Sequence, residues 1–489
     1  MIALRHRRIL FLIFTASFFV TASSVLFYAY GYRFSIERGI FVYTGSLSLK
    51  ANVETVRIRI DDEEIPEKKL GILNNSIQVS GLNPGEHFVE VSAPGYQSWG
   101  KKFVIASGLT TEFWNIFLVE ENYPREAVSG TERVIKMFPA PNGLLAVVKR
   151  EGERYSVDLL DITSEQSEEV FSTTEARFLP TIETNIEWSP ESHKLIIPLI
   201  KDAVPFFTIV DIESKSAKTI DTLSGISAPL RAPRWDATTR DFLFFLSGQS
   251  LYRLDTRSET PSATLISPYV SAYDLSGNKL LYLGRDGLVY EINGDGNDQS
   301  PKQITDTALT LAPGGIYSLI SYDDTRLAMI EETTGTLSVY NEKAPTHLRE
   351  LARGITSIQY SDDGKKLLLY SDNEISVYFN RDWETQPFRS ADSIVQIARF
   401  STPVRNVQWA EDYEHVIFSL GKNVKMIELD NRDRRNLSDL LTLGTAPLQL
   451  LPRFGSDTLY VVTDVEDEAQ ANNTVFRITL PQFATFLGL

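Results

Sequence analysis

One short motif recurs through most of the 489-residue chain and constrains its fold more than any other feature. Each copy has an aromatic residue, then four to six polar or turn-forming residues, and then a short apolar run. The clearest copies are Trp188-Ser189-Pro190-Glu191-Ser192-His193-Lys194 and Tyr360-Ser361-Asp362-Asp363-Gly364-Lys365-Lys366. Successive aromatic residues lie 38 to 50 residues apart, with a mean of about 45. The eight aromatic positions are Phe138, Trp188, Trp235, Tyr273, Tyr322, Tyr360, Trp409 and Phe454.

A period of about 45 residues, with three or four short strands per repeat, is typical of a β-propeller built from four-stranded blades. A single blade cannot cover its own apolar faces, so the blades stack around an axis. After Val475–Ile478 little chain remains for a last fourth strand, whereas residues 124–129, before the first repeat, have the pattern of one. We therefore predict that residues 124–129 close the ring, which removes the exposed sheet edges. The sequence predicts eight blades, or seven if the Phe138 or the Phe454 repeat fails.

Two kinds of strand can be identified within the repeats. Apolar third strands are predicted at Ser156–Leu160, Phe207–Val210, Ser250–Leu254, Leu288–Ile292, Leu337–Tyr340, Ile375–Phe379, Val424–Leu429 and Val475–Ile478. Short fourth strands with polar flanks are predicted at Ala217–Ile220, Lys302–Thr305 and Arg435–Ser438.

The chain begins with a long uncharged segment, from Ile9 to Tyr32. At ~1.5 Å per residue, a helix of this length extends over ~36 Å and crosses a hydrocarbon core of ~30 Å. Three arginines precede it, so the positive-inside rule places residues 1–8 in the cytoplasm and the chain after Arg33 outside. A signal peptide cleaved near Thr21-Ala22-Ser23-Ser24 is the alternative, but the apolar run continues beyond that point. We expect residues 9–32 to form an uncleaved, single-pass transmembrane helix.

The charge of the chain is divided unevenly. Residues 1–38 carry +4, and because the whole chain carries −16, the remainder carries −20. Anionic lipid headgroups repel so acidic a domain, so we expect the helix alone to hold it at the cell membrane. The pI of about 5.0 also argues against nucleic acid as a partner.

Residues 33–121 show a different pattern, of short strands separated by turns. Val56-Arg57-Ile58-Arg59-Ile60 alternates apolar and charged residues as a half-buried strand does. Leu82-Asn83-Pro84-Gly85-Glu86-His87, followed by Phe88–Val91, Gly95-Tyr96 and a closing strand that ends at Phe117-Leu118-Val119, resembles the PEGA domain. In that family of small surface-exposed β-sandwiches a Ser-x-Pro-x-Gly-Ala stretch stands where this chain has residues 49–53. The resemblance implies a non-catalytic spacer or envelope-contact module.

The repeats of residues 122–489 carry a second resemblance. Trp188–Leu199 and Tyr360–Tyr370 resemble the TolB-type or WD40-like propeller repeat, in which an aromatic-Ser-Pro-Asp-Gly-Lys-Lys turn precedes an apolar strand. The recurring Gly-His and Trp-Asp pairs of true WD40 repeats are missing, since Gly-His does not occur and Trp-Asp occurs once, at Trp235-Asp236. Most members of this class are binding platforms, so the resemblance implies a binding function.

The composition leaves little material for catalysis. The chain has no cysteine, which excludes disulfides, thiolate metal sites and cysteine nucleophiles, and its five histidines are scattered singly. Neither the Gly-x-Ser-x-Gly motif of propeller peptidases nor a phosphate-binding Gly-Lys-Ser/Thr loop is present. We therefore name no catalytic, cofactor-binding or metal-binding residue, and we expect no cofactor and no enzymatic activity.

A few residues have both a chemical and a structural interpretation. Asn293–Asp298 alternates oxygen-bearing side chains that can ligate Ca²⁺, but it lacks the following Glu and is better explained as a turn. Asp323-Asp324 and Asp362-Asp363 resemble acid–base pairs, but they recur at equivalent repeat positions, which favours turns. Trp99 and Trp114 can line a carbohydrate contact, although a place in the sandwich core is favoured. Trp188, Trp235 and Trp409 are expected to pack within the blades.

Together these features predict a membrane-anchored extracytoplasmic binding or scaffold protein, whose propeller contacts an envelope protein or a cell-wall polymer. The alternative is a propeller enzyme of the glycosidase or lyase type that acts on cell-envelope polysaccharide. Two carboxylates about 5–10 Å apart in a cleft at the channel mouth favour that alternative. A third possibility is that the sandwich makes the contact and the propeller is only a scaffold.

Overall fold

The computed structural model describes residues 4–35, 39–69, 76–179, 186–220, 226, 229–239, 241–257, 262–277, 279–294, 300–464 and 473–480. It begins with one helix, α1 (Leu4–Ala29), and a hairpin of β1 (Tyr32–Ser35) and β2 (Ile40–Tyr43). The span Arg7–Ala29 is long and apolar enough to cross a membrane, with a mean hydropathy of 2.2. The helix ends three residues before the expected Tyr32, because Gly31 adopts a left-handed φ of +89° and β1 starts directly after it.

Two sheets face each other in the next part of the chain, as a β-sandwich. One sheet has the order β6-β3-β9, with β3 and β9 parallel, and the other has the order β5-β4-β7-β8. Alternate residues such as Leu47, Ile58, Val89 and Phe113 fill the space between them. The strands are β3 (Gly45–Ala51), β4 (Thr55–Ile60), β5 (Glu63–Lys69), β6 (Ile77–Leu82), β7 (Gly85–Ser92), β8 (Trp99–Ile105) and β9 (Thr110–Ile116).

Eight further sheets follow within the described residues, each an antiparallel blade with four strands in sheet order. Blade 1 comprises β11 (Val134–Pro139), β12 (Leu145–Glu151), β13 (Arg154–Asp161) and β14 (Gln166–Thr173). Blade 2 comprises β15 (Arg177–Phe178) and β16 (Glu187–Trp188), which share the first position, and then β17 (Lys194–Lys201), β18 (Val204–Asp211) and β19 (Ala217–Ile220). Blade 3 comprises β20 (Leu230–Trp235), β21 (Phe242–Ser247), β22 (Ser250–Asp255) and β23 (Ala263–Pro268), and blade 4 comprises β24 (Val270–Ser276), β25 (Lys279–Gly284), β26 (Val289–Ile292) and β27 (Lys302–Gln303).

Blade 5 comprises β28 (Tyr317–Asp323), β29 (Arg326–Glu331), β30 (Thr336–Asn341) and β31 (Leu348–Ala352). Blade 6 comprises β32 (Ser357–Tyr360), β33 (Lys366–Tyr370), β34 (Glu374–Phe379) and β35 (Ser393–Arg399). Blade 7 comprises β36 (Val404–Trp409), β37 (His415–Leu420), β38 (Asn423–Glu428) and β39 (Leu437–Thr442). Blade 8 comprises β40 (Gln449–Arg453), β41 (Thr458–Asp464), β42 (Asn473–Thr479) and β10 (Glu126–Ala127).

The pairing of β10 with β42 closes the ring. Glu126 lies opposite Arg477 and Ala127 opposite Phe476, and the Val128 N–H donates to the Val475 carbonyl at 2.9 Å. A strand that precedes the first blade thus completes the last one, so blade 8 has no unpaired fourth position. The predicted closure by residues 124–129 and the prediction of eight blades are confirmed.

Apolar clusters between neighbouring blades hold the ring together. Eight such clusters link consecutive blades in the described part of the chain, and one of them joins blade 8 to blade 1 through Tyr460, Val462, Val134 and Met137. Each blade therefore buries both faces against its neighbours, as expected for repeats that cannot fold singly. The first strands of several adjacent blades contact one another, which places them around the central channel.

Six of the eight predicted third strands lie within observed third strands. The other two are one residue too long, because β26 begins at Val289, after the predicted Leu288, and β38 ends at Glu428, before the predicted Leu429. Two of the three predicted fourth strands also differ from prediction. The strand expected at Arg435–Ser438 is β39, which begins only at Leu437 because the Asn436 N–H donates to Glu428 Oε1 at 2.7 Å instead of continuing the ladder. The strand expected at Lys302–Thr305 ends at Gln303, because the N–H groups of Ile304 and Thr305 both donate to the Val289 carbonyl.

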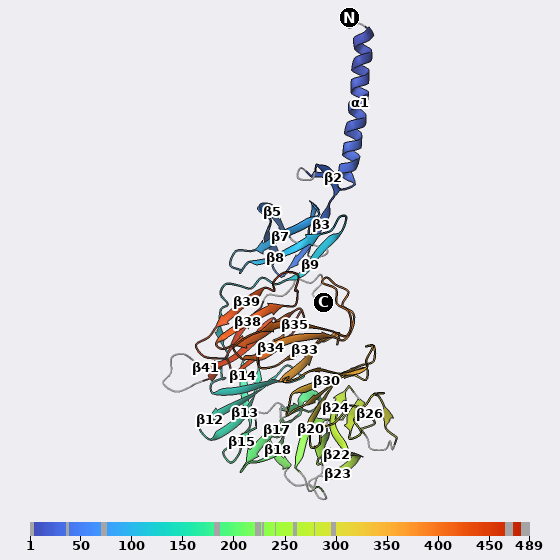
Figure 1. The fold of residues 1–489 in the computed structure, drawn as a ribbon. Helices are drawn as coiled ribbons and strands as arrows, with labels where there is room; N and C mark the ends of the chain where they lie inside the picture. The colour runs from blue at the N-terminus through green and yellow to red at the C-terminus, as the bar shows by residue number, and fades with distance from the viewer. Residues whose placement is uncertain are drawn as a thin grey trace.

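The sandwich is docked on the propeller through a buried charged contact (Figure 1). Lys101 Nζ of β8 donates to Glu428 Oε1 at 2.5 Å and to the Asp430 carbonyl at 2.9 Å, and the Lys101 side chain is 0% exposed. Trp99 Nε1 donates to the other carboxylate oxygen of Glu428 at 2.9 Å. On β9, which belongs to the other sheet of the sandwich, Trp114 Nε1 donates to the Gln386 carbonyl at 2.9 Å. Both partners belong to the third strands of blades 6 and 7 or to the connections after them.

The two faces of the propeller are defined by alternate connections. In an antiparallel blade, the connections from first to second strand and from third to fourth strand lie at one end of the sheet. The second-to-third connection and the link to the next blade lie at the other end. The sandwich contacts the first kind in blade 7, so we call that side the sandwich face and the opposite side the far face.

Candidate functional site

The carboxylates that resembled acid–base pairs are turn residues. Asp323 Oδ1 accepts hydrogen bonds from the N–H and the hydroxyl of Thr325, and Asp323 Oδ2 is paired with Arg326. Burial tends to raise the pKa of Asp323, but the hydrogen bonds from Arg326 and Thr325 outweigh it and lower the pKa below its ordinary value. Asp324 pairs with Lys279 at 3.0 Å. These groups hold the turn between β28 and β29.

The second pair has the same arrangement one blade later. Asp363 Oδ1 accepts from the Lys365 N–H at 2.9 Å and from the Ser361 hydroxyl at 2.7 Å. The backbone carbonyl of Asp362 accepts a hydrogen bond from the Tyr322 hydroxyl at 2.7 Å. These contacts explain the recurrence of the motif, since its polar residues close a turn and link it to the preceding blade.

The tryptophans lie in cores and at the docking contact. Trp235 and Trp409 are buried between blades, and Trp188 packs on the cluster between blades 1 and 2, as predicted. Trp99 is part of the sandwich core, also as favoured, and its indole N–H reaches the propeller. Trp114 differs from prediction: its ring lies 6.0 Å from that of Trp383, at the contact between sandwich and propeller.

The possible calcium loop falls largely outside the described residues, which include only Asn293 and Gly294 of it. Elsewhere in the described chain, no group of three or more His, Asp or Glu side chains is placed to hold a metal ion.

A charged cluster links the first strands of blades 2 to 5. Arg234 Nε contacts Glu187 Oε1 at 3.2 Å, and Arg234 Nη1 contacts Asp274 Oδ1 at 2.9 Å. Asp274 Oδ2 accepts from both the N–H and the hydroxyl of Ser321, each at 2.8 Å. Burial raises the pKa of Glu187, against the attraction of Arg234. The two carboxylates thus share one permanent cation, and the cluster joins the first strands of four consecutive blades.

Buried ionisable groups also lie on the sandwich face of blade 7. His415 Nδ1 is 2.6 Å from Asp412 Oδ2, and its ring lies 5.5 Å from that of Phe117, which follows the sandwich. Glu414 is paired with Lys366, whose ammonium also donates to the Tyr413 carbonyl at 2.6 Å. Burial raises the pKa of Glu414 to about 7 despite the Lys366 charge. Because these side chains are covered, their protonation acts on stability and not on a substrate.

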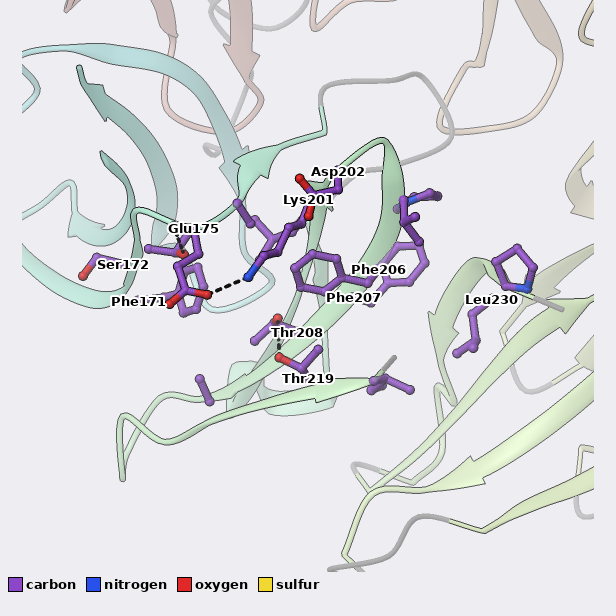
Figure 2. A pocket seen from close by; sticks show the side chains of 18 residues that line it. Phe171, Ser172, Glu175, Lys201, Asp202, Phe206, Phe207, Thr208, Thr219 and Leu230 are labelled. Atoms are coloured by element: carbon purple, nitrogen blue, oxygen red, sulfur yellow. Dashed lines mark hydrogen bonds and ion pairs between the residues drawn. The ribbon is translucent and has the colours of Figure 1, made fainter. Parts of the chain in front are cut away.

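A pocket lies on the far face, across blade 2. It has a volume of about 580 Å³ and is shared by the end of β14, the turn between β17 and β18, β19 and the start of β20. Figure 2 shows Phe206 and Phe207 at its centre, with Phe171 on the side of blade 1 and Leu230 on the side of blade 3. Phe207 and Leu230 are buried, whereas Phe206 is only half-buried. An apolar floor of this kind suits an apolar side chain of a partner.

One ion pair borders the pocket. Lys201 Nζ donates to Glu175 Oε2 at 2.7 Å, and Figure 2 shows this bond crossing the rim. The hydrogen bond between them lowers the pKa of Glu175 and raises that of Lys201, so both are charged at neutral pH. Thr208 and Thr219 face each other below, with their hydroxyls 3.4 Å apart. The rim therefore offers fixed charges for recognition, while neither ionised member is poised to transfer a proton near neutral pH.

Sequence reasoning did not find this pocket. Its residues come from three blades, and Phe206 and Phe207 lie in a strand whose apolar run reads as ordinary blade core. The one available signal is the doubled aromatic beside the exposed Val204 and Pro205, where the strand leaves its turn.

Comparison with known proteins identifies no family. Neither a protein-family model nor a curated protein matches the sequence. Among solved structures, BamB from Moraxella catarrhalis is similar over 72% of this chain and 100% of its own, with 11% identity and a TM-score of 0.42. The computationally designed Ika8 protein covers 72% and 98% (12% identity, TM-score 0.43), and the Cps50 (Swd1) β-propeller domain of Myceliophteria thermophila 73% and 98% (12%, 0.39). These TM-scores are below 0.5, so the propeller assignment rests on the strand pairing of this chain itself.

Proposed function

We propose that this chain is a non-catalytic binding protein, anchored in the cell membrane by α1, whose propeller binds a protein partner in the cell envelope. On this proposal residues 1–8 are cytoplasmic and everything after α1 is outside, as the arginines before the helix favour. The sandwich is a PEGA-like spacer and the propeller a TolB-type or WD40-like platform. The anchor and the sandwich place the binding surface at a fixed distance from the membrane.

The observation that carries the proposal is the position and chemistry of the pocket on the far face. The docked sandwich covers part of the opposite face at blades 6 and 7, whereas the pocket lies across blade 2. Its apolar floor within a rim of fixed charges is the usual composition of a protein-binding hot spot. The carboxylates at the channel are bridged by Arg234, which supports binding over glycosidase chemistry.

Site-specific photo-crosslinking in cells tests this proposal. A photoreactive amino acid replaces Val204, which is 60% exposed at the pocket rim, and as a matched control Leu265, which is 48% exposed on the outer strand of blade 3. We expect the Val204 position to give adducts with one or a few envelope proteins and the Leu265 position to give none of them. Phe206→Asp, which places a charge on the apolar floor, should abolish those adducts.

Two outcomes contradict the proposal. Identical adducts from both positions mean that the pocket selects nothing. Adducts of the protein only with itself, together with co-purified wall polymer, point to polysaccharide as the ligand, and turnover of that polymer establishes the enzyme alternative.

A further inference from the structure

A surface beside α1 exposes large apolar side chains that no other part of the described chain covers. The hairpin of β1 and β2 follows the helix after two residues, and it exposes about half of Phe34, Ile40 and Phe41. Tyr28, Tyr30 and Tyr43 are also exposed beside it. In sequence, residues 27–46 contain three charged residues, Arg33, Glu37 and Arg38, and so a single carboxylate and a net charge of +1. This surface contrasts with the acidic domains beyond it and has the composition of a contact with lipid.

Ring contacts fix the hairpin to the end of the helix. Phe41 stacks on Phe27 of α1 at 5.9 Å and meets Phe34 edge-on at 5.3 Å. Phe27 also contacts Tyr32 at 5.5 Å, and Tyr32 contacts Tyr43 at 5.1 Å. The hairpin is therefore held at one angle to α1, and Figure 1 shows it projecting sideways between the helix and the sandwich.

Arg33 strengthens the same junction. Its guanidinium lies 3.4 Å from the centre of the Tyr28 ring and donates to the carbonyls of Tyr28 and Tyr32 at 2.9 and 3.1 Å. The Thr44 N–H and hydroxyl both donate to the Gly31 carbonyl, at 3.0 and 2.7 Å. The carbonyls of Tyr28, Gly31 and Tyr32 thus have hydrogen-bond donors where α1 ends, which lets the helix stop and the hairpin start at the same depth.

The length of α1 sets that depth. From Ile9 to Ala29 a helix extends over ~32 Å, which matches a hydrocarbon core of ~30 Å. The headgroup layer adds only about 5–8 Å on each side, so a hairpin that starts at Tyr32 and runs sideways lies inside this layer. Aromatic side chains favour that location because their rings are apolar and polarisable while their edges tolerate water.

We propose that the β1–β2 hairpin is a second membrane contact, embedded in the lipid headgroup layer next to α1, and that it fixes the orientation of the sandwich and propeller over the bilayer. This inference rests on the anchor of the proposed function, and it replaces the expectation that the helix alone touches lipid.

The test uses the full-length chain in vesicles of phosphatidylcholine and phosphatidylglycerol at 3:1. Because the native chain has no cysteine, single cysteines can carry a nitroxide label without background. Three positions are labelled: Ile40 in the hairpin, Phe18 in α1, and Arg57, which is exposed on β4 of the sandwich. Collision rates with oxygen, which concentrates in the bilayer, and with a water-soluble nickel complex give the depth of each label.

We expect the label at Phe18 to lie in the hydrocarbon, the label at Ile40 in the headgroup layer and the label at Arg57 in water. The nickel accessibility at Ile40 should be at least fivefold lower than at Arg57. Phe41→Cys should report the same depth as Ile40→Cys, which guards against a local disturbance. If Phe18 is buried but the Ile40 label is as water-accessible as Arg57, the hairpin proposal is wrong and the anchor stands. If the Phe18 label is also in water, both fail. Disulfide-linked dimers through Ile40→Cys, with nickel accessibility restored on dilution, show instead that a second copy covers the hairpin.

Discussion

At the scale of single residues, a carboxylate recurs at the turn between the first and second strands of several blades. Asp236, Asp323, Asp363 and Asp412 each accept a hydrogen bond from the N–H two residues further on, at 2.8 to 2.9 Å. Recurrence at equivalent positions was enough to predict a turn role from sequence. Asp323 and Asp412 pair with Arg326 and His415, three residues further on, whereas the partner of Asp236, Arg253, comes from a distant strand and was not predictable.

His415 makes stability depend on pH. Burial tends to lower its pKa, but the Asp412 carboxylate outweighs this and raises the pKa above the ordinary 6.5. The folded chain therefore binds this proton more tightly than the unfolded chain. The resulting stabilisation is complete below pH 6.5 and is lost as the pH rises through the raised pKa. Each tenfold gain in proton affinity is worth ~1.4 kcal/mol.

We expect His415→Gln to remove the decline in the free energy of unfolding above pH 7. A slope that remains between about pH 4.5 and 7 includes the contributions of Glu414 and Glu187, whose raised pKa values act in the same direction. The measurement is denaturant unfolding of the full-length chain in detergent, followed by tryptophan fluorescence between pH 5 and 9. A wild-type stability that is flat above pH 6.5 contradicts the prediction.

At the scale of elements, the period of the repeats was sufficient to place most strands, because each apolar run forms one strand that packs against the neighbouring blades. The exceptions are elements whose place depends on distant residues. β39 starts late because Arg434 and Asn436, which precede it, contact Lys101 and Gly100 of the sandwich. The β1–β2 hairpin was not predicted, because the helix was expected to continue to Tyr32 and the chain from Arg33 on was assigned to the sandwich, whereas β1 already begins at Tyr32.

Closure of the ring depends on one buried threonine beside β10. The Thr131 hydroxyl donates to the Val128 carbonyl at 2.6 Å and accepts from the Val475 N–H at 3.2 Å. Thr131→Val keeps the shape but leaves both backbone groups unsatisfied, so we expect a loss of about 1–3 kcal/mol in the free energy of unfolding. Amide exchange should accelerate mainly in β42, as seen by mass spectrometry. Thr307→Val, at an exposed site, is the control. Equal acceleration in all blades would show that closure is not local.

At the scale of the whole molecule, the two modules were predictable but their rigid attachment was not. Lys101 stands next to Lys102 in β8, so by sequence the two read as a pair of solvated charges. The partner of Lys101, Glu428, follows 327 residues later, at the end of a blade strand. Burying either charged side chain alone costs several kcal/mol, so the two are stable in the interior only as a pair. Long-range electrostatic pairs of this kind leave no periodic trace in a sequence.

Lys101 thus determines whether the sandwich and the propeller move as one body. Lys101→Met leaves Glu428 buried without its cation, so we expect about 3–5 kcal/mol lower stability and a loosened contact. Nitroxide labels on Arg57→Cys in the sandwich and Lys422→Cys in blade 7, both exposed, report the distance between the two by pulsed electron resonance. The parent chain should give one narrow distance distribution and Lys101→Met a broad one, whereas Lys102→Met, at the exposed neighbouring position, should leave it narrow. A broad distribution in the parent would mean that the sandwich is a flexible spacer, and the propeller would then sample many orientations over the membrane.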